Sequence, residues 1–306
     1  MAQHVTIKVS PLQIEEMKKY YESFIVSTDG EYTIFLAKKG GVTITAFSSK
    51  KENHKVTFVG EYALEEAKIW DENAAIAEPK EKVKEEWLCL DTQIGSDEVG
   101  VGDFLLPMVV VAAFVRKKDL PILEEYGVHD SKKLKDEDIL KIGPTLAKKF
   151  FLSKLTLSNE KYNEMIDKGE NLNSLKAKMH NRALLNLFKQ FPDTKYIFVD
   201  QFVGEDKYYS YLNDKNEKKV VNIVFKTKGE SFYPCVALAS VMARYSFLKE
   251  KEKLEKHYKM SIPFGASKKS DEFAKEFINK YGVEEFTKIA KKNFVNYKNA
   301  IEVKLI

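Results

Sequence analysis

From Trp87 onward, apolar strand-like segments alternate with long helical segments, and this alternation constrains the fold more than any other feature. Such alternation is typical of an α/β domain, in which helices cover a sheet. Strands are expected at 88–98, 108–115, 150–157, 196–199 and 220–225. Helices are expected at 136–148, 172–190, 233–256, 271–281 and 283–292.

The first seventy residues follow another pattern. Val5, Ile7 and Val9 alternate with polar residues as in a strand, and a helical segment starts at Pro11. Three more strands are expected at 32–37, 42–47 and 55–59, followed by a helix at 63–70. A small α+β domain at residues 1–70, a linker at 71–86 and an α/β domain at 87–306 are therefore predicted.

Composition limits the protein class and the kinds of metal site that we expect. The chain has 44% hydrophobic and 31% charged residues, with no apolar run near the ~20 residues of a membrane span and no visible secretory signal, so we expect a cytoplasmic protein that does not cross a membrane. The cysteines, Cys89 and Cys235, are far apart, and the five histidines are scattered. Any metal ion would therefore have to be held by oxygen ligands.

Asp97 and Glu98 end a strand-like segment and run directly into the glycine pair Gly100 and Gly102. Carboxylates at a strand end beside a flexible loop are typical of catalytic sites, although a solvated turn is the alternative. Because neighbouring side chains of a strand point to opposite faces, we expect a bulge or break at 99–100 to redirect Glu98.

Two further acids occupy comparable places. Asp200 ends the apolar strand at 196–199, and Glu230 lies between a strand and a long helix. Taken alone, each acid could instead be a structural residue of a turn or of a helix start. Together with Asp97 and Glu98 they suit hard divalent cations such as Mg²⁺, two of which ~4 Å apart can activate water and stabilise the leaving oxygen of a phosphodiester.

The motifs DEVGVGDF at 97–104 and DSKKL at 130–134 resemble those of the type 2 ribonuclease H family. Asp200 and Glu230 match that family's third and fourth acids. The segment NLNSLKAKMHN at 171–181 and the N-terminal extension are similar to the bacterial ribonuclease HIII branch. The resemblance covers essentially the whole chain.

This resemblance implies a ribonuclease H-like domain with a mixed sheet flanked by helices, after a small domain similar to half of a TATA-binding protein. It also implies an endonuclease that hydrolyses the RNA strand of RNA/DNA hybrids and leaves 5′-phosphate and 3′-hydroxyl ends. Two Mg²⁺ or Mn²⁺ ions would act in catalysis. The implied catalytic metal ligands are Asp97, Glu98, Asp200 and Glu230.

The loop that contains Gly100, Val101 and Gly102, called the glycine loop below, can contribute to substrate recognition. The backbone of Gly100 and Gly102 can approach the minor groove, where the 2′-hydroxyl distinguishes RNA from DNA, although an ordinary tight turn is the alternative. The ribonuclease HII branch has arginine between these glycines and recognises ribonucleotide junctions with the loop, whereas this chain has Val101. Poor cleavage at single embedded ribonucleotides is therefore expected.

Other substrate contacts are less specific. Phosphate binding is a hypothesis for the serine and lysines of the DSKKL motif and for lysines at the rim of the small domain's sheet; a helix-start turn and a solvated hairpin are the alternatives. In the 171–181 motif, His180 is interpreted as a packed polar residue and Asn181 as a substrate contact. The candidate substrate residues are Gly100, Val101, Gly102, Ser131, Lys132, Lys133, Asn181, Lys38, Lys39, Lys50 and Lys51.

Two competing hypotheses remain open. The protein could bind nucleic acid without catalysis, in which case the acids are structural, or it could be a different two-metal nuclease that cuts DNA. Loss of cleavage with retained binding in Asp97→Asn separates the first from an enzyme, and cleavage of a hybrid beside duplex DNA and duplex RNA separates the second. A monomer is expected.

Overall fold

The chain forms two compact units, residues 1–84 and 85–306, which are described one at a time. The computed structural model describes residues 3–27, 33–48, 53–76, 87–88, 90–213 and 218–302. The predicted substrate residues Lys50 and Lys51 lie outside these ranges. No helix within these ranges is long and apolar enough to span a membrane.

The N-terminal unit is a five-stranded antiparallel sheet in the order β1-β5-β4-β3-β2. Alternate residues such as Val5, Ile44 and Phe58 are buried on one face, against the two helices. The intervening residues face outward, as the two-residue period of a strand requires. The elements are β1 (Gln3–Val9), α1 (Pro11–Tyr20), β2 (Ile25–Ser27), β3 (Thr33–Lys39), β4 (Val42–Phe47), β5 (His54–Gly60) and α2 (Ala63–Lys68).

The N-terminal unit continues beyond its last helix. Ala74 is buried in the unit's core, and Ile76 forms a β-bridge with Val5. The segment predicted as a linker therefore begins within the fold of this unit.

The C-terminal unit contains a five-stranded mixed sheet in the order β10-β9-β6-β7-β8. β6, β9 and β10 are parallel, whereas β7 is antiparallel to both β6 and β8. The carboxyl ends of three strands consequently meet at one edge. The strands are β6 (Thr92–Val99), β7 (Met108–Arg116), β8 (Phe151–Leu157), β9 (Tyr196–Asp200) and β10 (Ile223–Lys226).

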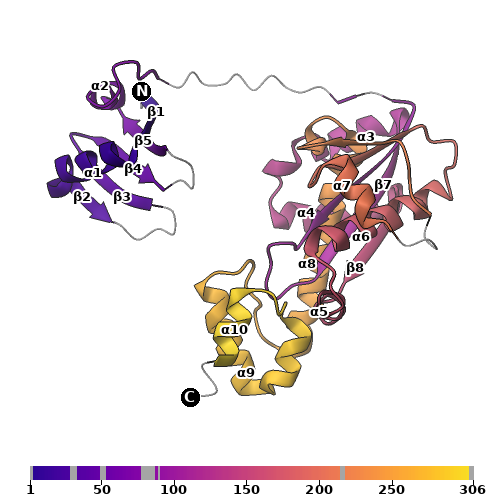
Figure 1. Ribbon diagram of the computed structural model, residues 1–306. Coiled ribbons are helices and arrows are strands. Elements are labelled where there is room, and N and C mark those ends of the chain that lie inside the picture. The colour runs from indigo at the N-terminus through magenta and orange to yellow at the C-terminus, as the bar shows by residue number, and fades with distance from the viewer. Residues whose placement is uncertain are drawn as a thin grey trace. The chain divides into compact units, whose positions relative to one another are not determined.

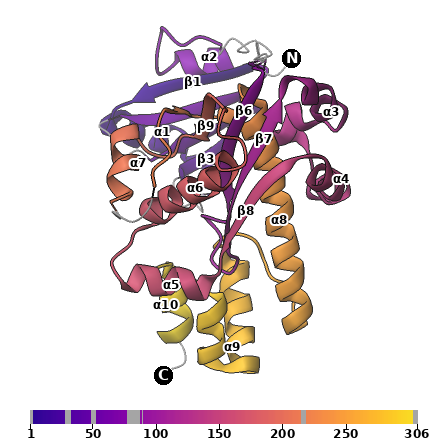
Figure 2. The same cartoon turned by 90° about the vertical axis from the view of Figure 1, so that its right-hand side faces the viewer.

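Helices cover both faces of this sheet (Figures 1 and 2). Val109 and Val111 of β7 pack on the side of α4 (Asp136–Lys149) and α8 (Pro234–Tyr258), whereas Val110 packs on the side of α6 (Leu172–Phe188). β7 is therefore apolar throughout rather than alternating, because both of its faces are buried. Shorter helices are α3 (Leu120–Glu125) and α7 (Glu205–Tyr211).

Three helices gather at one end of the C-terminal unit (Figure 2). They are α5 (Asn159–Asp167), α9 (Lys268–Ile289) and α10 (Val295–Glu302). Gly282, with φ of 85°, interrupts α9, which agrees with the two helices expected there. The expected fold class is confirmed in both units.

Candidate functional site

Asp97 and Glu98 lie at the end of β6, where the strand is regular. The register with β7 is unbroken through Val99, so the expected redirection of Glu98 does not occur and the chain turns only at Gly100, with φ of 86°. Asp97 faces α8 and Glu98 faces α6, as strand alternation requires. Both carboxylates still reach one pocket, because they stand at the open end of the strand.

Glu98 is held by two side chains of α6. His180 Nε2 lies 2.9 Å from Glu98 Oε2, and the buried Lys176 forms an ion pair with Oε1. Ser96 Oγ lies 2.8 Å from His180 Nδ1 and orients the ring. Burial would raise the pKa of Glu98, but the hydrogen bond and charge of His180, with the ion pair of Lys176, hold it below its usual range.

Asp97 has the opposite electrostatic environment. Its side chain is buried, and burial with the charges of Glu98 and Asp200 raises its pKa to about 8. A hydrogen bond from Ser240 and one from the backbone N–H of Glu98, at 2.7 Å, partly oppose this shift. Negative charge is therefore in excess around Asp97.

Asp200 ends β9, beside β6 in the sheet. The backbone N–H of Gly229 donates to Asp200 Oδ1 at 2.8 Å, which ties the strand end to the short 3₁₀ helix η4 (Gly229–Ser231). Burial raises the pKa of Asp200, and the charges of Glu230 and Glu98 raise it further against the Gly229 hydrogen bond. Glu230 is buried in η4 and forms an ion pair with Lys132.

These acids share a cavity of about 480 Å³ at the carboxyl ends of β6 and β9. Cationic and hydroxyl side chains complete its wall, so the cavity has both ligands for a cation and donors for an anion. Its lining comprises Asp97, Glu98, Val99, Ser131, Lys132, Leu134, Asp136, Ile139, Asp200, Lys228, Glu230, Ser240, Val241 and Arg244.

The carboxylates fit a hard divalent cation in donor chemistry. All four offer oxygen. Burial first, and the charges of neighbouring carboxylates second, raise the pKa of Asp97 and of Asp200, and a bound cation would offset both effects. Over the described ranges, no group of three or more His, Cys, Asp or Glu side chains is drawn together as a complete metal site. The ion pairs of Glu98 with Lys176 and of Glu230 with Lys132 engage two of the four acids instead.

The glycine loop follows β6 directly. A Cβ on Gly100 would lie 2.2 Å from the carbonyl oxygen of Pro107, and its φ of 86° also favours glycine. A Cβ on Gly102 would meet nothing within 4 Å. Val101 is partly buried against a small apolar cluster that includes Met108, so its side chain contributes to packing.

Of the other predicted substrate residues, Ser131 and Lys132 line the cavity, and Lys133 is exposed in the same 3₁₀ turn. Asn181 is not brought to the cavity. It is fully buried, donates to the carbonyl of Lys218 at 2.9 Å and accepts from the N–H of Val220 at 2.9 Å, so its amide is used within the fold.

In the N-terminal unit, Lys38 is exposed at the end of β3. Lys39 is instead engaged: its Nζ lies 2.9 Å from Glu66 Oε1 and donates to Tyr20 Oη at 2.9 Å. Burial would lower the pKa of Lys39, but these two partners raise it. Lys39 therefore contributes mainly to the structure of the N-terminal unit, through its contacts with Glu66 and Tyr20.

Sequence reasoning missed several residues around the cavity. Ser240 and Arg244 lie on α8 one helical turn apart and face the acids, and Arg244 forms two hydrogen bonds of 2.8 Å with Asp136. Lys176 lies in the 171–181 motif but was not predicted as a site residue. Its spacing of four residues from His180 could have indicated that both side chains share one helix face.

Known proteins resemble both units. Residues 94–297 match the ribonuclease HII family, and residues 4–84 match a domain of unknown function, DUF3378. Ribonuclease HIII of Bacillus cereus (strain ATCC 10987 / NRS 248) is 39% identical over 318 residues, which cover 99% of each chain. The chain belongs to the type 2 ribonuclease H family, in its ribonuclease HIII branch.

Solved structures of this family have the same architecture. Bst-RNase HIII, in a complex with Mn²⁺, shares 32% identity and a TM-score of 0.68 over 98% of both chains. Aquifex aeolicus RNase H3 has a TM-score of 0.54 at 21% identity, over 94% of this chain and 99% of its own, which shows the shared fold alone. The chain is thus a ribonuclease H enzyme with the two-unit organisation of the ribonuclease HIII branch.

Proposed function

We propose that this enzyme is an endonuclease that hydrolyses the RNA strand of RNA/DNA hybrids. The observation that carries the proposal is the convergence of Asp97, Glu98, Asp200 and Glu230 on one cavity at a strand-end edge, in a chain of the ribonuclease HIII branch. Hybrid cleavage that leaves 5′-phosphate and 3′-hydroxyl ends is what this membership implies.

The four carboxylates are the proposed ligands of two divalent cations, Mg²⁺ or Mn²⁺. When bound, such ions activate the attacking water and stabilise the leaving oxygen of a phosphodiester. The presence of Mn²⁺ in the related Bst-RNase HIII structure supports this choice of cation. Oxygen-only ligands in a site with excess negative charge support it independently.

Residues of the chain prepare the site for this chemistry. His180 and Lys176 fix both oxygens of Glu98, so the carboxylate keeps one orientation and stays ionised. Ser240 and the Gly229 amide orient Asp97 and Asp200 in the same way. These three acids are therefore oriented before substrate arrives, which lowers the reorganisation required in the transition state.

Lys132 and Arg244 are proposed to bind phosphates of the RNA strand. Lys132 is 64% exposed, so its ammonium can reach a phosphate, and a cation bound to Glu230 would replace it beside that buried carboxylate. Arg244 is anchored by Asp136 and stacks over the ring of Phe264 at 4.7 Å, which presents a fixed donor at the cavity wall.

The glycine loop is the proposed contact with the hybrid's minor groove, where RNA exposes its 2′-hydroxyls. Gly102 leaves open space for that approach. Val101 packs into the protein and offers no charged group to a junction, so the enzyme should cut ribonucleotide tracts better than single embedded ribonucleotides.

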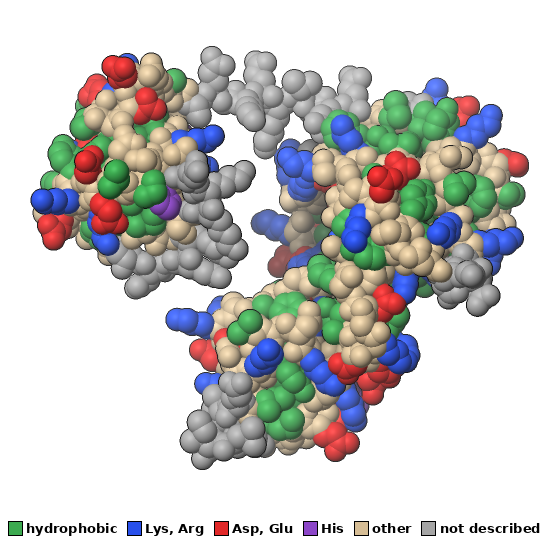
Figure 3. All heavy atoms as spheres, viewed as in Figure 1, with side chains coloured by type: hydrophobic (Ala, Val, Ile, Leu, Met, Phe, Trp, Pro, Cys, Tyr) green, Lys and Arg blue, Asp and Glu red, His purple; other side chains and the backbone are tan. Residues whose placement is uncertain are grey.

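The outer face of the N-terminal sheet is the proposed second contact. Thr6, Thr57 and Thr45 are adjacent across three strands, and Lys8 pairs with Lys55 beside them. Hydroxyls and lysines on the outer face of a sheet suit phosphates and sugars rather than base edges. On the face that Figure 3 shows, lysines and arginines are interspersed with acidic and apolar side chains rather than gathered into one patch.

Cleavage of end-labelled substrates tests the proposal. A 20-base-pair hybrid, the matching duplex DNA and duplex RNA, and a duplex with one ribonucleotide would be incubated with the full chain in Mg²⁺ and then Mn²⁺. We expect metal-dependent cutting of the hybrid first, by a monomeric enzyme. Preferred cutting of duplex DNA would support a DNA nuclease, and binding without cutting would support a non-catalytic binder.

A further inference from the structure

Lys291 is a lysine whose side chain is almost completely buried, with 1% exposed. It lies just after the end of α9, and its side chain points into the glycine loop from the protein interior. Its Nζ donates to the carbonyl of Gly100 at 2.5 Å and to that of Asp103 at 2.6 Å, and its backbone N–H donates to the carbonyl of Phe104 at 3.0 Å. One residue thus binds three carbonyls within residues 100–104.

Burial of an amine is costly unless its hydrogen bonds are made. An apolar side chain of similar length would fill the same space more cheaply, but it would leave the carbonyls of Gly100 and Asp103 buried without these donors. The buried amine is therefore explained by the two loop carbonyls that it binds.

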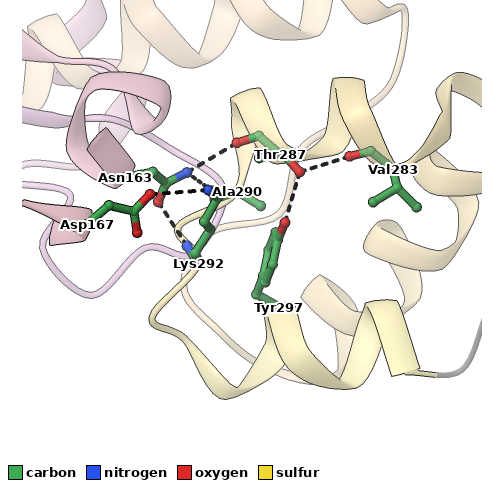
Figure 4. Close-up of polar contacts among 7 residues, drawn as sticks. All are labelled: Asn163, Asp167, Val283, Thr287, Ala290, Lys292 and Tyr297. Atoms are coloured by element: carbon green, nitrogen blue, oxygen red, sulfur yellow. Dashed lines mark hydrogen bonds and ion pairs between the residues drawn. The ribbon is translucent and has the colours of Figure 1, made fainter. Parts of the chain in front are cut away.

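The segment that carries Lys291 is itself clamped from α5 (Figure 4). Asn163 Nδ2 donates to the carbonyls of Thr287 at 3.1 Å and Ala290 at 2.9 Å, and its Oδ1 accepts from the N–H of Lys292 at 2.9 Å. Thr287 Oγ1 lies 2.8 Å from Tyr297 Oη, which links α9 to α10. The backbone on both sides of Lys291 is therefore held in place by hydrogen bonds that do not involve its own side chain.

The loop is held on its inner side and open on its outer side. The N–H of Gly265 donates to Asp103 Oδ1 at 2.6 Å, and the N–H of Phe104 donates back to the Gly265 carbonyl at 3.1 Å. Gly102, between the two carbonyls bound by Lys291, has nothing within 4 Å of its Cβ position. Lys291 thus acts on the part of the loop whose other side is free to meet a ligand.

We infer that Lys291 is a positioning residue for substrate recognition: it fixes the glycine loop in the form that contacts the RNA strand, and so makes hybrid binding depend on the C-terminal helices. This inference rests on the proposed function. The alternative is a purely structural lysine, whose loss would reduce the amount of folded enzyme without changing the affinity of the enzyme that remains.

The test compares Lys291→Met with Lys292→Met, which removes the same charge from the next residue, where the side chain lies 3.4 Å from Asp167 at the surface. Steady-state cleavage of the hybrid would be measured with the folded fraction determined for each protein. We expect Lys291→Met to raise KM about tenfold with kcat within about twofold, and Lys292→Met to match the unsubstituted chain.

A double-mutant cycle with Gly102→Ala sharpens the result. Because both changes act on the same loop, their effects on KM should fall short of the product of the single effects, whereas Lys291→Met combined with Lys8→Ala of the N-terminal sheet should give the full product. Full multiplication in both pairs, or a fall in kcat that tracks the folded fraction at constant KM, would overturn the inference.

Lys291→Gln serves as a second variant in case the methionine variant folds poorly, because the glutamine amide keeps N–H donors without a charge. If both variants fail to fold, Lys291 serves stability and the inference is rejected. The outcome also separates the two proposals. If the unsubstituted chain cuts no hybrid, the proposed function fails, whereas if it cuts and Lys291→Met behaves as Lys292→Met, only the role of Lys291 fails.

Discussion

At the residue scale, Asp97 combines burial with two neighbouring carboxylates. Asp97→Asn keeps the shape of the side chain and removes its negative charge. We expect hybrid cleavage in Mg²⁺ to fall by at least about 10³-fold, because a proposed metal ligand is lost, while the Kd for the hybrid stays within about threefold. Gel-shift titration and single-turnover cleavage on one preparation measure both quantities. Retained cleavage would remove Asp97 from the metal site.

The two loop glycines predict different outcomes for the same substitution. Gly100→Ala combines a φ of 86° with a 2.2 Å approach to the Pro107 carbonyl, so we expect a loss of more than about 2 kcal/mol in the free energy of unfolding. Gly102→Ala has open space, so its stability should change by less than about 0.5 kcal/mol while kcat/KM for the hybrid falls at least about fivefold. Urea unfolding and cleavage kinetics compare the pair, and equal destabilisation would contradict the geometry.

Lys291 also predicts how stability depends on pH. Burial lowers its pKa from 10.5 to about 7, and the charge of Asp103 only partly opposes this. Between those two values the unfolded chain holds more protons than the folded one, so the contribution of Lys291 becomes more favourable as pH rises above about 7, by up to about 1.4 kcal/mol per pH unit. Tyr162, whose ring lies 5.5 Å away, stays protonated there because burial raises its own pKa.

Urea unfolding at pH 7, 8 and 9 checks this dependence against Lys291→Met. The difference in free energy between the two proteins should change steadily in favour of the unsubstituted chain as pH rises. Parallel curves would show that Lys291 keeps an ordinary pKa in the folded protein.

Sequence predicted the acids of the site better than the residues that support them. Asp97 and Asp200 were found because each ends an apolar strand, which is a local signal. Lys291 lies 191 residues from Gly100, and nothing in its neighbourhood distinguishes it from the many surface lysines of the chain. Asn181 shows the converse, because a motif position was interpreted as a substrate contact although the amide bonds to its own fold.

At the element scale, all five strands of the C-terminal unit were predicted because their apolar runs are bounded by turns, although β6 begins at Thr92 rather than at 88 and β10 at Ile223 rather than at 220. β2 (Ile25–Ser27) was missed because three residues are too few to show an alternating pattern. α5 was missed for another reason: its buried face includes Asn159 and Asn163, so the polar residues hide the helical period. Both asparagines are buried to bind backbone carbonyls of the C-terminal segment.

α5 therefore carries a prediction of its own. Asn163→Leu keeps the volume but leaves the carbonyls of Thr287 and Ala290 and the N–H of Lys292 without their partner. We expect the free energy of unfolding to fall by about 2–3 kcal/mol. Lys161→Leu is the control on the same helix, since it removes only an exposed pair with Glu164 and should cost less than about 0.5 kcal/mol. A similar loss in both variants would argue against the clamp.

At the scale of the whole molecule, we propose that the two units divide the work between chemistry and binding. The four acids and the glycine loop belong to residues 85–306, whereas the sheet with outward threonines and lysines belongs to residues 1–84. Sequence predicted this order of units from the change in pattern near Trp87.

Removal of residues 1–84 tests the division. We expect the Kd for the hybrid to rise at least about tenfold while kcat at saturating substrate stays within about threefold, because the proposed phosphate contacts are lost and the carboxylate cavity is untouched. The slope of log Kd against log salt should also become shallower. In the full chain, Lys8→Ala with Lys55→Ala should reproduce part of that change, since the two residues are cross-strand neighbours on the outer face. Unchanged affinity of the shortened chain would assign hybrid binding to the C-terminal unit alone.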